Sequence, residues 1–124
     1  MRRLAPCPAT PNCVCSAAPP DDARHHVEPL PATGDPAAAF ARARAAALAL
    51  PRTTLVVDEP GYLRVECRSA IFRFIDDLEL MLDADAHVIH VRSASRLGRS
   101  DFGVNRARVE RLRPALAGDR RPGC

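Results

Sequence analysis

Large aromatic side chains are scarce in this chain of 124 residues, which has four Phe, one Tyr and no Trp. Its hydrophobic content is 47%, but much of that is alanine, so few bulky side chains are available for packing. A chain of this length forms one domain. The composition therefore predicts a thin, two-layer structure with a modest core, and it argues against an enzyme built around a deep cavity.

Lysine is absent, and all 18 basic residues are arginine, although the formal net charge is only +3. A biased base composition of the genome produces such a replacement without any function, and this is the interpretation that we favour. The functional alternative is oxyanion binding, because the guanidinium group matches the geometry of carboxylates and phosphates.

Long apolar runs are also missing. No stretch of 18 apolar residues occurs, so the sequence predicts no membrane-spanning helix. Arg2 and Arg3 are not followed by an apolar segment, which is not the pattern of a secretory signal. From these two observations we expect a cytoplasmic protein.

Seven prolines interrupt residues 1–34 and prevent a sustained helix there. We expect an irregular, proline-rich arm in this segment, with Val27 and Leu30 able to dock on a core. A single α+β domain is expected at residues 35–117 and a flexible tail at residues 118–124.

Two helices are expected in the domain. The first begins at Asp35-Pro36, where aspartate caps and proline fits the first turn, and ends near Leu50 because Pro51 stops it. The second begins near Asn105, and Pro114 should kink it or end it early. The apolar stripes of the two helices are Phe40, Ala43, Ala47 and Leu50, and Val109, Leu112 and Leu116.

Four strand patterns lie between the helices, at residues 53–58, 62–68, 77–83 and 87–93, joined by short connections typical of antiparallel neighbours. The predicted fold is a four-stranded antiparallel sheet with two helices on one face and a proline-rich N-terminal arm. The opposite face is expected to carry Arg64, Glu66, Arg68, Glu79, Met81, His90 and Arg92. We interpret it as a solvated face with cross-strand ion pairs; the alternative is a binding surface that the arm partly covers.

The cysteines do not have the spacing of a zinc site, because Cys7, Cys13 and Cys15 contain no CxxC pair and no second half-site follows. Two alternatives remain for Cys7 and Cys13: a disulfide in an oxidising compartment, or two reduced thiols in the cytosol. Cys67 belongs to the inward set of its strand and His90 to the outward set, which argues against a thiol hydrolase that uses both.

Asp76-Asp77 is the adjacent carboxylate pair with the strongest context, and such pairs can bind Mg²⁺. Neighbouring side chains of a strand point to opposite faces, however, so a bulge or turn role is the expectation. The sequence predicts neither a metal nor a cofactor.

The segment from Arg92 to Arg108 concentrates arginines, serines and two glycines just before a helix. Helix N-termini favour anions, and arginine and serine add donors. The candidate binding residues are Arg92, Ser95, Arg96, Ser100, Asn105 and Arg106. The structural alternative is that Arg92 or Arg96 pairs with Asp76 or Asp77.

The leading functional hypothesis is a non-enzymatic module that binds an anionic ligand such as a phosphate, a carboxylate or a lipid headgroup. The alternatives are an enzyme that uses Asp76 or His90 for proton transfer, and a scaffold that binds a protein through the charged sheet face. Nucleic acid is not an expected partner, because no recognised motif is present and aromatic residues for stacking are scarce.

Motifs along most of the chain resemble a bacterial and plastid family known as domain of unknown function 1499. They are Cys7-Pro8, Pro11-Asn12-Cys13-Val14, Glu66-Cys67-Arg68-Ser69, Phe74-Ile75-Asp76-Asp77, Val91-Arg92-Ser93-Ala94-Ser95-Arg96, Gly98 and Ser100-Asp101-Phe102-Gly103-Val104-Asn105-Arg106. The resemblance implies no activity, since none is established for the family. Members often follow an anchor or export signal, which is not visible here, and usually have serine where this chain has Cys15, which implies that Cys15 is incidental.

Overall fold

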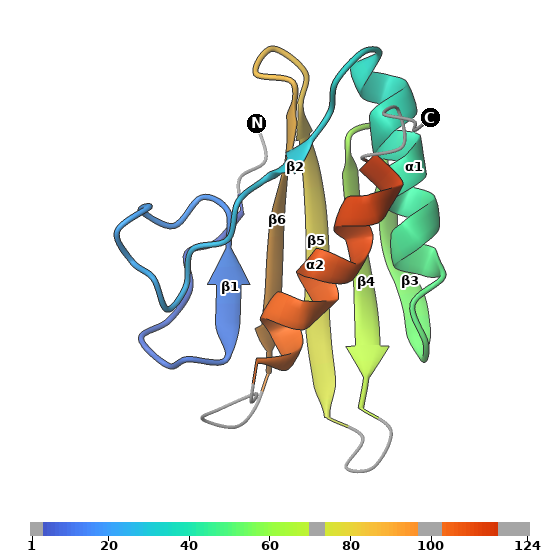
Figure 1. Ribbon diagram of the computed structural model, residues 1–124. Coiled ribbons are helices and arrows are strands. Elements are labelled where there is room, and N and C mark those ends of the chain that lie inside the picture. Colours follow the sequence, from blue (N-terminus) through green and yellow to red (C-terminus); the bar gives the residue numbers. More distant parts are fainter. Residues whose placement is uncertain (1–3, 70–73, 97–102, 117–124) are drawn as a thin grey trace.

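One mainly antiparallel sheet is covered on one face by two helices (Figure 1). The computed structural model describes residues 4–69, 74–96 and 103–116. The elements in chain order are β1 (Cys13–Cys15), β2 (Leu30–Pro31), α1 (Pro36–Leu48), β3 (Thr53–Glu59), β4 (Tyr62–Arg68), β5 (Ile75–Asp83), β6 (Val88–Ser95) and α2 (Val104–Leu116). The strand order is β1-β6-β5-β4-β3, and β2 also pairs with β6. The α+β class is as predicted.

The sheet has six strands rather than the four that the sequence predicted, because the proline-rich segment contributes β1 and β2. Both pair antiparallel with β6, with Val14 opposite Ser93 and Leu30 opposite Ile89. Prolines prevent a helix, but they do not prevent short extended pieces between them. These pieces cover the edge of β6, which would otherwise present unpaired backbone groups. Val14, Val27 and Leu30 are buried in the core, so the segment is part of the sheet.

The core lies between the sheet and the helices, and the alternation read from the sequence identified its sheet side correctly. In the register, Val65 is opposite Leu78, and Leu80 is opposite both Leu63 and Val91. The inward side chains are all fully buried, and they are Leu63, Val65, Leu78, Leu80, Ile89 and Val91. This single apolar layer binds both helices to the sheet.

Helix α1 starts as predicted, because Asp35 accepts a hydrogen bond from the Ala37 amide at 3.2 Å and Pro36 occupies the first turn. Helix α2 continues past Pro114 to Leu116, so the expectation that this proline ends the helix early was wrong. Pro114 lies in the last turn, where it removes few helical hydrogen bonds, and the buried Leu116 side chain anchors that turn.

The lower end of the molecule in Figure 1 brings together elements that are distant in the sequence. Here α1 ends and leads into β3, β4 ends, β5 begins, and α2 begins. In the described part of the chain, neither helix has the length and apolar character needed to cross a membrane. The predicted tail, residues 118–124, lies outside the described residues.

Candidate anion-binding site

Two of the arginines predicted to bind an anion lie on the sheet face opposite the helices and are paired there. Arg96 donates to Asp77 at 2.8 and 2.9 Å and to Glu66 at 2.6 Å. Arg92 lies 3.6 Å from Glu79 and donates to the Pro6 carbonyl at 3.4 Å. The structural alternative, in which Arg96 pairs with Asp77, is therefore what the structure contains.

Burial alone would raise the pKa of Asp77, but hydrogen bonds and charge from Arg96, with the charge of Arg64, hold that pKa below its ordinary value. The hydrogen bonds to Asp77 and then Glu66 raise the pKa of Arg96 further above its already high value. Three arginines and three acidic residues share this face in pairs: Arg64, Arg92, Arg96, Glu66, Asp77 and Glu79. This arrangement offers little net charge to an anion.

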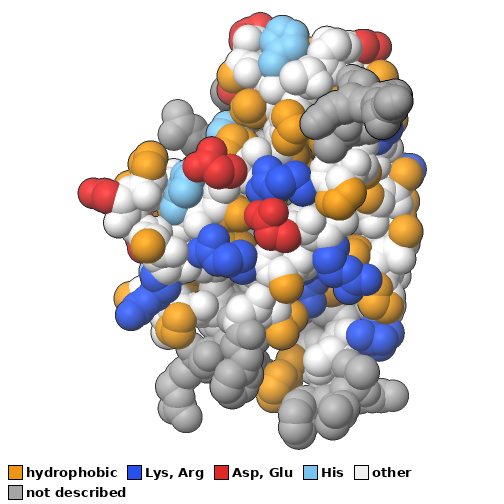
Figure 2. Space-filling view, in the orientation of Figure 1, with side chains coloured by type: hydrophobic (Ala, Val, Ile, Leu, Met, Phe, Trp, Pro, Cys, Tyr) orange, Lys and Arg blue, Asp and Glu red, His pale blue; other side chains and the backbone are white. Residues whose placement is uncertain are grey.

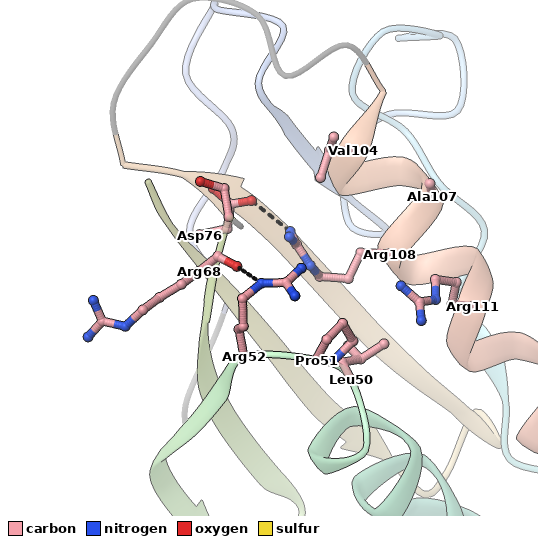
Figure 3. A pocket seen from close by; sticks show the side chains of 10 residues that line it. Leu50, Pro51, Arg52, Arg68, Asp76, Val104, Ala107, Arg108 and Arg111 are labelled. Atoms are coloured by element: carbon pink, nitrogen blue, oxygen red, sulfur yellow. Dashed lines mark hydrogen bonds and ion pairs between the residues drawn. The ribbon is translucent and has the colours of Figure 1, made fainter. Parts of the chain in front are cut away.

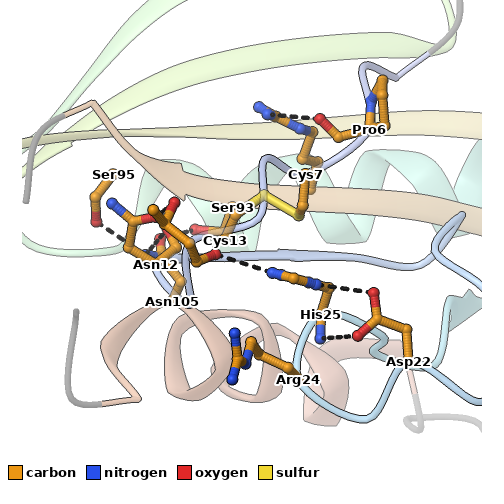
Figure 4. The surroundings of a disulfide bond; sticks show 12 residues. Pro6, Cys7, Asn12, Cys13, Asp22, Arg24, His25, Ser93, Ser95 and Asn105 are labelled. Carbon is orange, nitrogen blue, oxygen red and sulfur yellow. Dashed lines mark hydrogen bonds and ion pairs between the residues drawn. A yellow bond between two sulfur atoms is a disulfide. The ribbon is translucent and has the colours of Figure 1, made fainter. Parts of the chain in front are cut away.

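Asn105 and Ser95 lie together in a buried polar cluster between α2 and the sheet (Figure 4). The Asn105 amide donates to the Asn12 carbonyl at 3.2 Å and to the Ser95 hydroxyl at 3.0 Å, and its oxygen accepts from Ser93 at 2.6 Å. Asn105 is fully buried. These bonds attach the first turn of α2 to β6 and to the segment before β1.

The remaining two predicted residues are separate from these. Arg106 donates to three backbone carbonyls of the N-terminal segment, those of His26 at 2.8 Å, Ala23 at 3.1 Å and Arg24 at 3.2 Å. Ser100 lies outside the described residues. The five described candidates therefore occupy three different places in the structure and do not surround a common cavity.

The structure also shows where the candidate carboxylates, the candidate thiol and the candidate histidine lie. Asp76 and Asp77 lie inside β5 rather than in a bulge or turn, and they point to opposite faces as expected. Cys67 is on the helix side with Val65, and His90 is on the other side, where it is 3.0 Å from the Ser16 hydroxyl. Among the residues that the structure describes, no group of three or more His, Cys, Asp or Glu is placed to hold a metal ion.

Of the two cysteine alternatives that the sequence left open, the structure contains the disulfide. Cys7 and Cys13 form a disulfide that closes the loop before β1 (Figure 4). Cys15 and Cys67 are free and buried. Burial raises the pKa of both thiols, so neither is prepared to act as a nucleophile.

A cavity of about 380 Å³ opens at the lower end of the molecule, between the end of α1 and the start of α2 (Figure 3). Three guanidinium groups are arranged around it, from Arg52 before β3 and from Arg108 and Arg111 on α2. Arg68 also lines the cavity, but its side chain points away from the other three in Figure 3. The remaining lining residues are Leu50, Pro51, Ser69, Asp76, Val104 and Ala107.

Positive charge exceeds negative charge in this cavity. Asp76 is the one carboxylate among the described residues that line it, and it is bound to Arg108 at 2.9 Å. Arg52 Nε donates to the Arg68 carbonyl at 3.0 Å, while Arg111 is exposed on the surface of α2. Figure 2 agrees, because the lower half of the helix-covered face shows arginine side chains and no acidic side chain among the described residues. Several positive charges around one cavity favour a bound counter-anion.

Arg52 also has an unusual backbone conformation for an arginine, with φ of 55°. The left-handed region suits glycine and asparagine, and other residues are held there at a cost of about 1 kcal/mol. The conformation turns the chain sharply between α1 and β3, and it places the Arg52 side chain against the end of β4. A strained position that carries a cationic side chain into a cavity is typical of a functional site.

The sequence reasoning did not select this group of arginines. Arg52 and Arg111 are far apart in the chain, and the fold alone brings them to one cavity. Arg108 and Arg111 are three residues apart on α2, which places them on one helix face. That spacing was the one local signal that could have drawn attention to them.

A family model matches residues 3–116, which is most of the chain, and its description is protein of unknown function (DUF1499). The chain belongs to this family. The resemblance seen in the sequence is thereby confirmed, and the family supplies no activity to test against the geometry. No curated protein matches the chain.

Proposed function

We propose that this member of the DUF1499 family is a non-enzymatic module that binds an anionic ligand in the cavity between α1 and α2. One observation carries the proposal: the guanidinium groups of Arg52, Arg108 and Arg111 are arranged around the cavity, and among the described residues that line it Asp76 is the one carboxylate. A phosphate or carboxylate group suits the donors, because each guanidinium presents several N–H groups in a plane.

The elements around the cavity support an anion rather than a neutral ligand. The first turns of α2 line it, and a helix N-terminus carries partial positive charge. Leu50, Pro51 and Ala107 line the wall between the arginines, and an apolar wall strengthens the attraction between opposite charges by excluding water. The cavity therefore combines cationic donors with partial desolvation.

The test is titration calorimetry of the purified protein with inorganic phosphate at low ionic strength, followed by acetate. We expect saturable phosphate binding, and acetate tells whether a carboxylate is accepted as well. Replacing Arg52 and Arg111 together by Gln should weaken phosphate binding about tenfold or more, since charge-assisted hydrogen bonds are lost. Both side chains are exposed, so the double variant should unfold at the same temperature as the parent.

The control for lost charge is Arg44→Gln, because Arg44 is an exposed arginine of α1 that pairs with Asp58 away from the cavity. This variant should bind phosphate like the parent. A second double variant, Arg96→Gln with Arg106→Gln, tests the site expected from the sequence. Loss of binding in that variant but not in the first would overturn the cavity as the site, and absence of binding by the parent would overturn the function.

The enzyme alternative gains one observation, which is that Asp76 lines the cavity. Asp76 is paired with Arg108, however, and the other candidate proton-transfer group, His90, lies on the opposite face of the sheet from the cavity. The scaffold alternative depends on the charged face, where the six paired residues leave little unbalanced charge. Anion binding is the function that the described geometry supports best.

A further inference from the structure

Two exposed apolar side chains flank the arginine-lined cavity. Phe74 and Val104 are each 47% exposed, the largest exposed fraction among the big hydrophobic side chains that the structure describes. Val104 lines the cavity itself. Phe74 is hydrogen-bonded to Ser69, another residue that lines the cavity. The Phe74 amide donates to the Ser69 hydroxyl at 3.0 Å, and the Ser69 amide donates to the Phe74 carbonyl at 2.9 Å.

These two side chains belong to the same end of the molecule. Phe74 immediately precedes β5, and Val104 is the first residue of α2. Both elements begin at the lower end in Figure 1, where α1 also ends. Arg52 lies in the turn between α1 and β3. One end of the protein thus presents apolar and cationic side chains together, the combination with which peripheral proteins bind the surface of an anionic bilayer.

The opposite end has the opposite charge. The turn after β3 follows Asp58, which pairs with Arg44, and Glu59. Strand β5 ends at Asp83, and the turn that follows it contains Asp85. Acidic side chains are visible at the upper end of the molecule in Figure 2, while arginines occupy the lower half. An anionic surface would attract the arginine end and repel the acidic end, so the charge distribution orients the protein with Phe74 and Val104 toward the lipid.

We propose that this end of the protein docks on bilayers that contain anionic phospholipid. This inference rests on the proposed function and names its ligand: the cavity takes the phosphate of a lipid headgroup, while Phe74 and Val104 enter the boundary between headgroups and acyl chains. A free, water-soluble phosphate compound would satisfy the arginines equally well. A lipid surface also accounts for the exposure of two apolar side chains at the same end of the protein, and for this reason we assign it.

The experiment is co-sedimentation of the protein with vesicles of phosphatidylcholine alone and of phosphatidylcholine mixed with phosphatidylglycerol. Phosphate titration of every variant accompanies it. The parent should sediment with the mixed vesicles and remain in solution with the neutral ones. Replacing Phe74 by Ser should reduce the bound fraction severalfold and leave phosphate affinity unchanged, because Phe74 is not among the residues that line the cavity. Arg52→Gln with Arg111→Gln should lose both kinds of binding.

The matched control is Leu55→Ser, since Leu55 is 41% exposed on β3 and is not among the residues that line the cavity. This variant should sediment like the parent, and thermal unfolding of all variants verifies that they are folded. Phosphate binding without vesicle binding by the parent would overturn the docking and leave the proposed function standing. Vesicle binding that survives Phe74→Ser would also overturn it, because general attraction to the charged surface then suffices. A parent that binds neither probe overturns both proposals.

Discussion

Arg108 Nη1 lies 2.9 Å from Asp76 Oδ2 at the base of the arginine-lined cavity. The guanidinium group also donates to Asn105 at 2.9 Å and to Ser93 at 3.2 Å, so it joins the cavity to the buried polar cluster of α2 and β6. Asp76 has two effects that oppose each other. It stabilises Arg108, whose side chain is only 12% exposed, and it neutralises part of the positive charge that a bound anion would need.

Asp76→Asn separates these two effects. The variant should be less stable by about 1–3 kcal/mol, because the largely buried Arg108 side chain loses its ionic partner. Its affinity for phosphate should rise, because the one carboxylate among the residues lining the cavity is gone. Urea unfolding and phosphate titration measure the two quantities. Asp77→Asn is the control: it breaks the ion pairs with Arg96 and Arg64 on the other face, and it should lower stability without changing phosphate affinity.

Asn105 has a structural role, and its substitution should show this. Asn105→Ala removes the partner of the Ser93 hydroxyl, the Ser95 hydroxyl and the Asn12 carbonyl inside the protein. We expect a loss of about 2 kcal/mol in the free energy of unfolding, since the buried Ser93 hydroxyl loses Asn105 as its acceptor, while the Asn12 carbonyl keeps the bond from the Ser95 amide. Arg44→Ala, which breaks one exposed ion pair, should lower the free energy of unfolding much less than Asn105→Ala does. Equal losses in the two variants would contradict the role assigned to Asn105.

The parts of the fold that sequence predicted correctly depend on local periodicity. Strands β4, β5 and β6 alternate apolar and polar residues, and α1 has a cap at Asp35 and a stop at Pro51, so each pattern is complete within its own segment. Strands β1 and β2 are too short to show a period. They form because β6 offers an edge, and a two-residue strand such as β2 has no signature of its own.

The candidate site was less predictable, because charge density along the chain is not charge density in space. The segment from Arg92 to Arg106 is rich in arginine, but in a strand and a helix successive side chains diverge. Arg96 points to Asp77 on one face, and Arg106 reaches the N-terminal segment on another. Arg52 lines the cavity from the turn after α1, where the sequence predicted only the end of a helix. Only the packing of α1 against α2 brings it near Arg111.

The attachment of the N-terminal segment should depend on pH through His25. Nδ1 of this histidine is 2.8 Å from Asp22, and Nε2 is 2.9 Å from the Thr10 carbonyl (Figure 4). The bond to the Thr10 carbonyl and then the bond to Asp22 raise the pKa of His25 above its ordinary 6.5. The hydrogen bond from His25 likewise lowers the pKa of Asp22 below its ordinary 3.8.

The sign of the effect follows from these directions. Because the pKa of His25 is raised in the folded state, its contribution to stability is complete below pH 6.5 and is lost as the pH rises through the folded value. The contribution of Asp22 is present above pH 3.8 and is lost as the pH falls through its lowered value. The free energy of unfolding should therefore decrease from about pH 6 to pH 8.

Urea unfolding at a series of pH values measures this decrease. His25→Gln should make the profile flatter than that of the parent. His87→Asn is the control, because His87 is exposed and its left-handed φ of 56° is tolerated by asparagine. A parent whose stability does not change between pH 6 and pH 8 would show that His25 is not protonated in the way that its two hydrogen bonds require.

The disulfide between Cys7 and Cys13 should stabilise the protein without taking part in anion binding. The two cysteines are six positions apart, and closing so short a loop in the unfolded chain contributes about 2 kcal/mol. Replacing both by Ala should lower the free energy of unfolding by that amount and leave phosphate affinity unchanged, since neither residue lines the arginine cavity. Reductant should lower the stability of the parent in the same way and have no effect on the double variant.

Alkylation of the unfolded parent without reductant, followed by peptide mass mapping, decides whether the bridge is present. If Cys7 and Cys13 are found alkylated, they were free thiols and the bridge is absent. This result would agree with the reducing cytoplasm expected from the sequence. A bridge recovered intact from cells that make the protein naturally would place the folded chain in an oxidising compartment instead, because such bonds do not persist among cytosolic thiols.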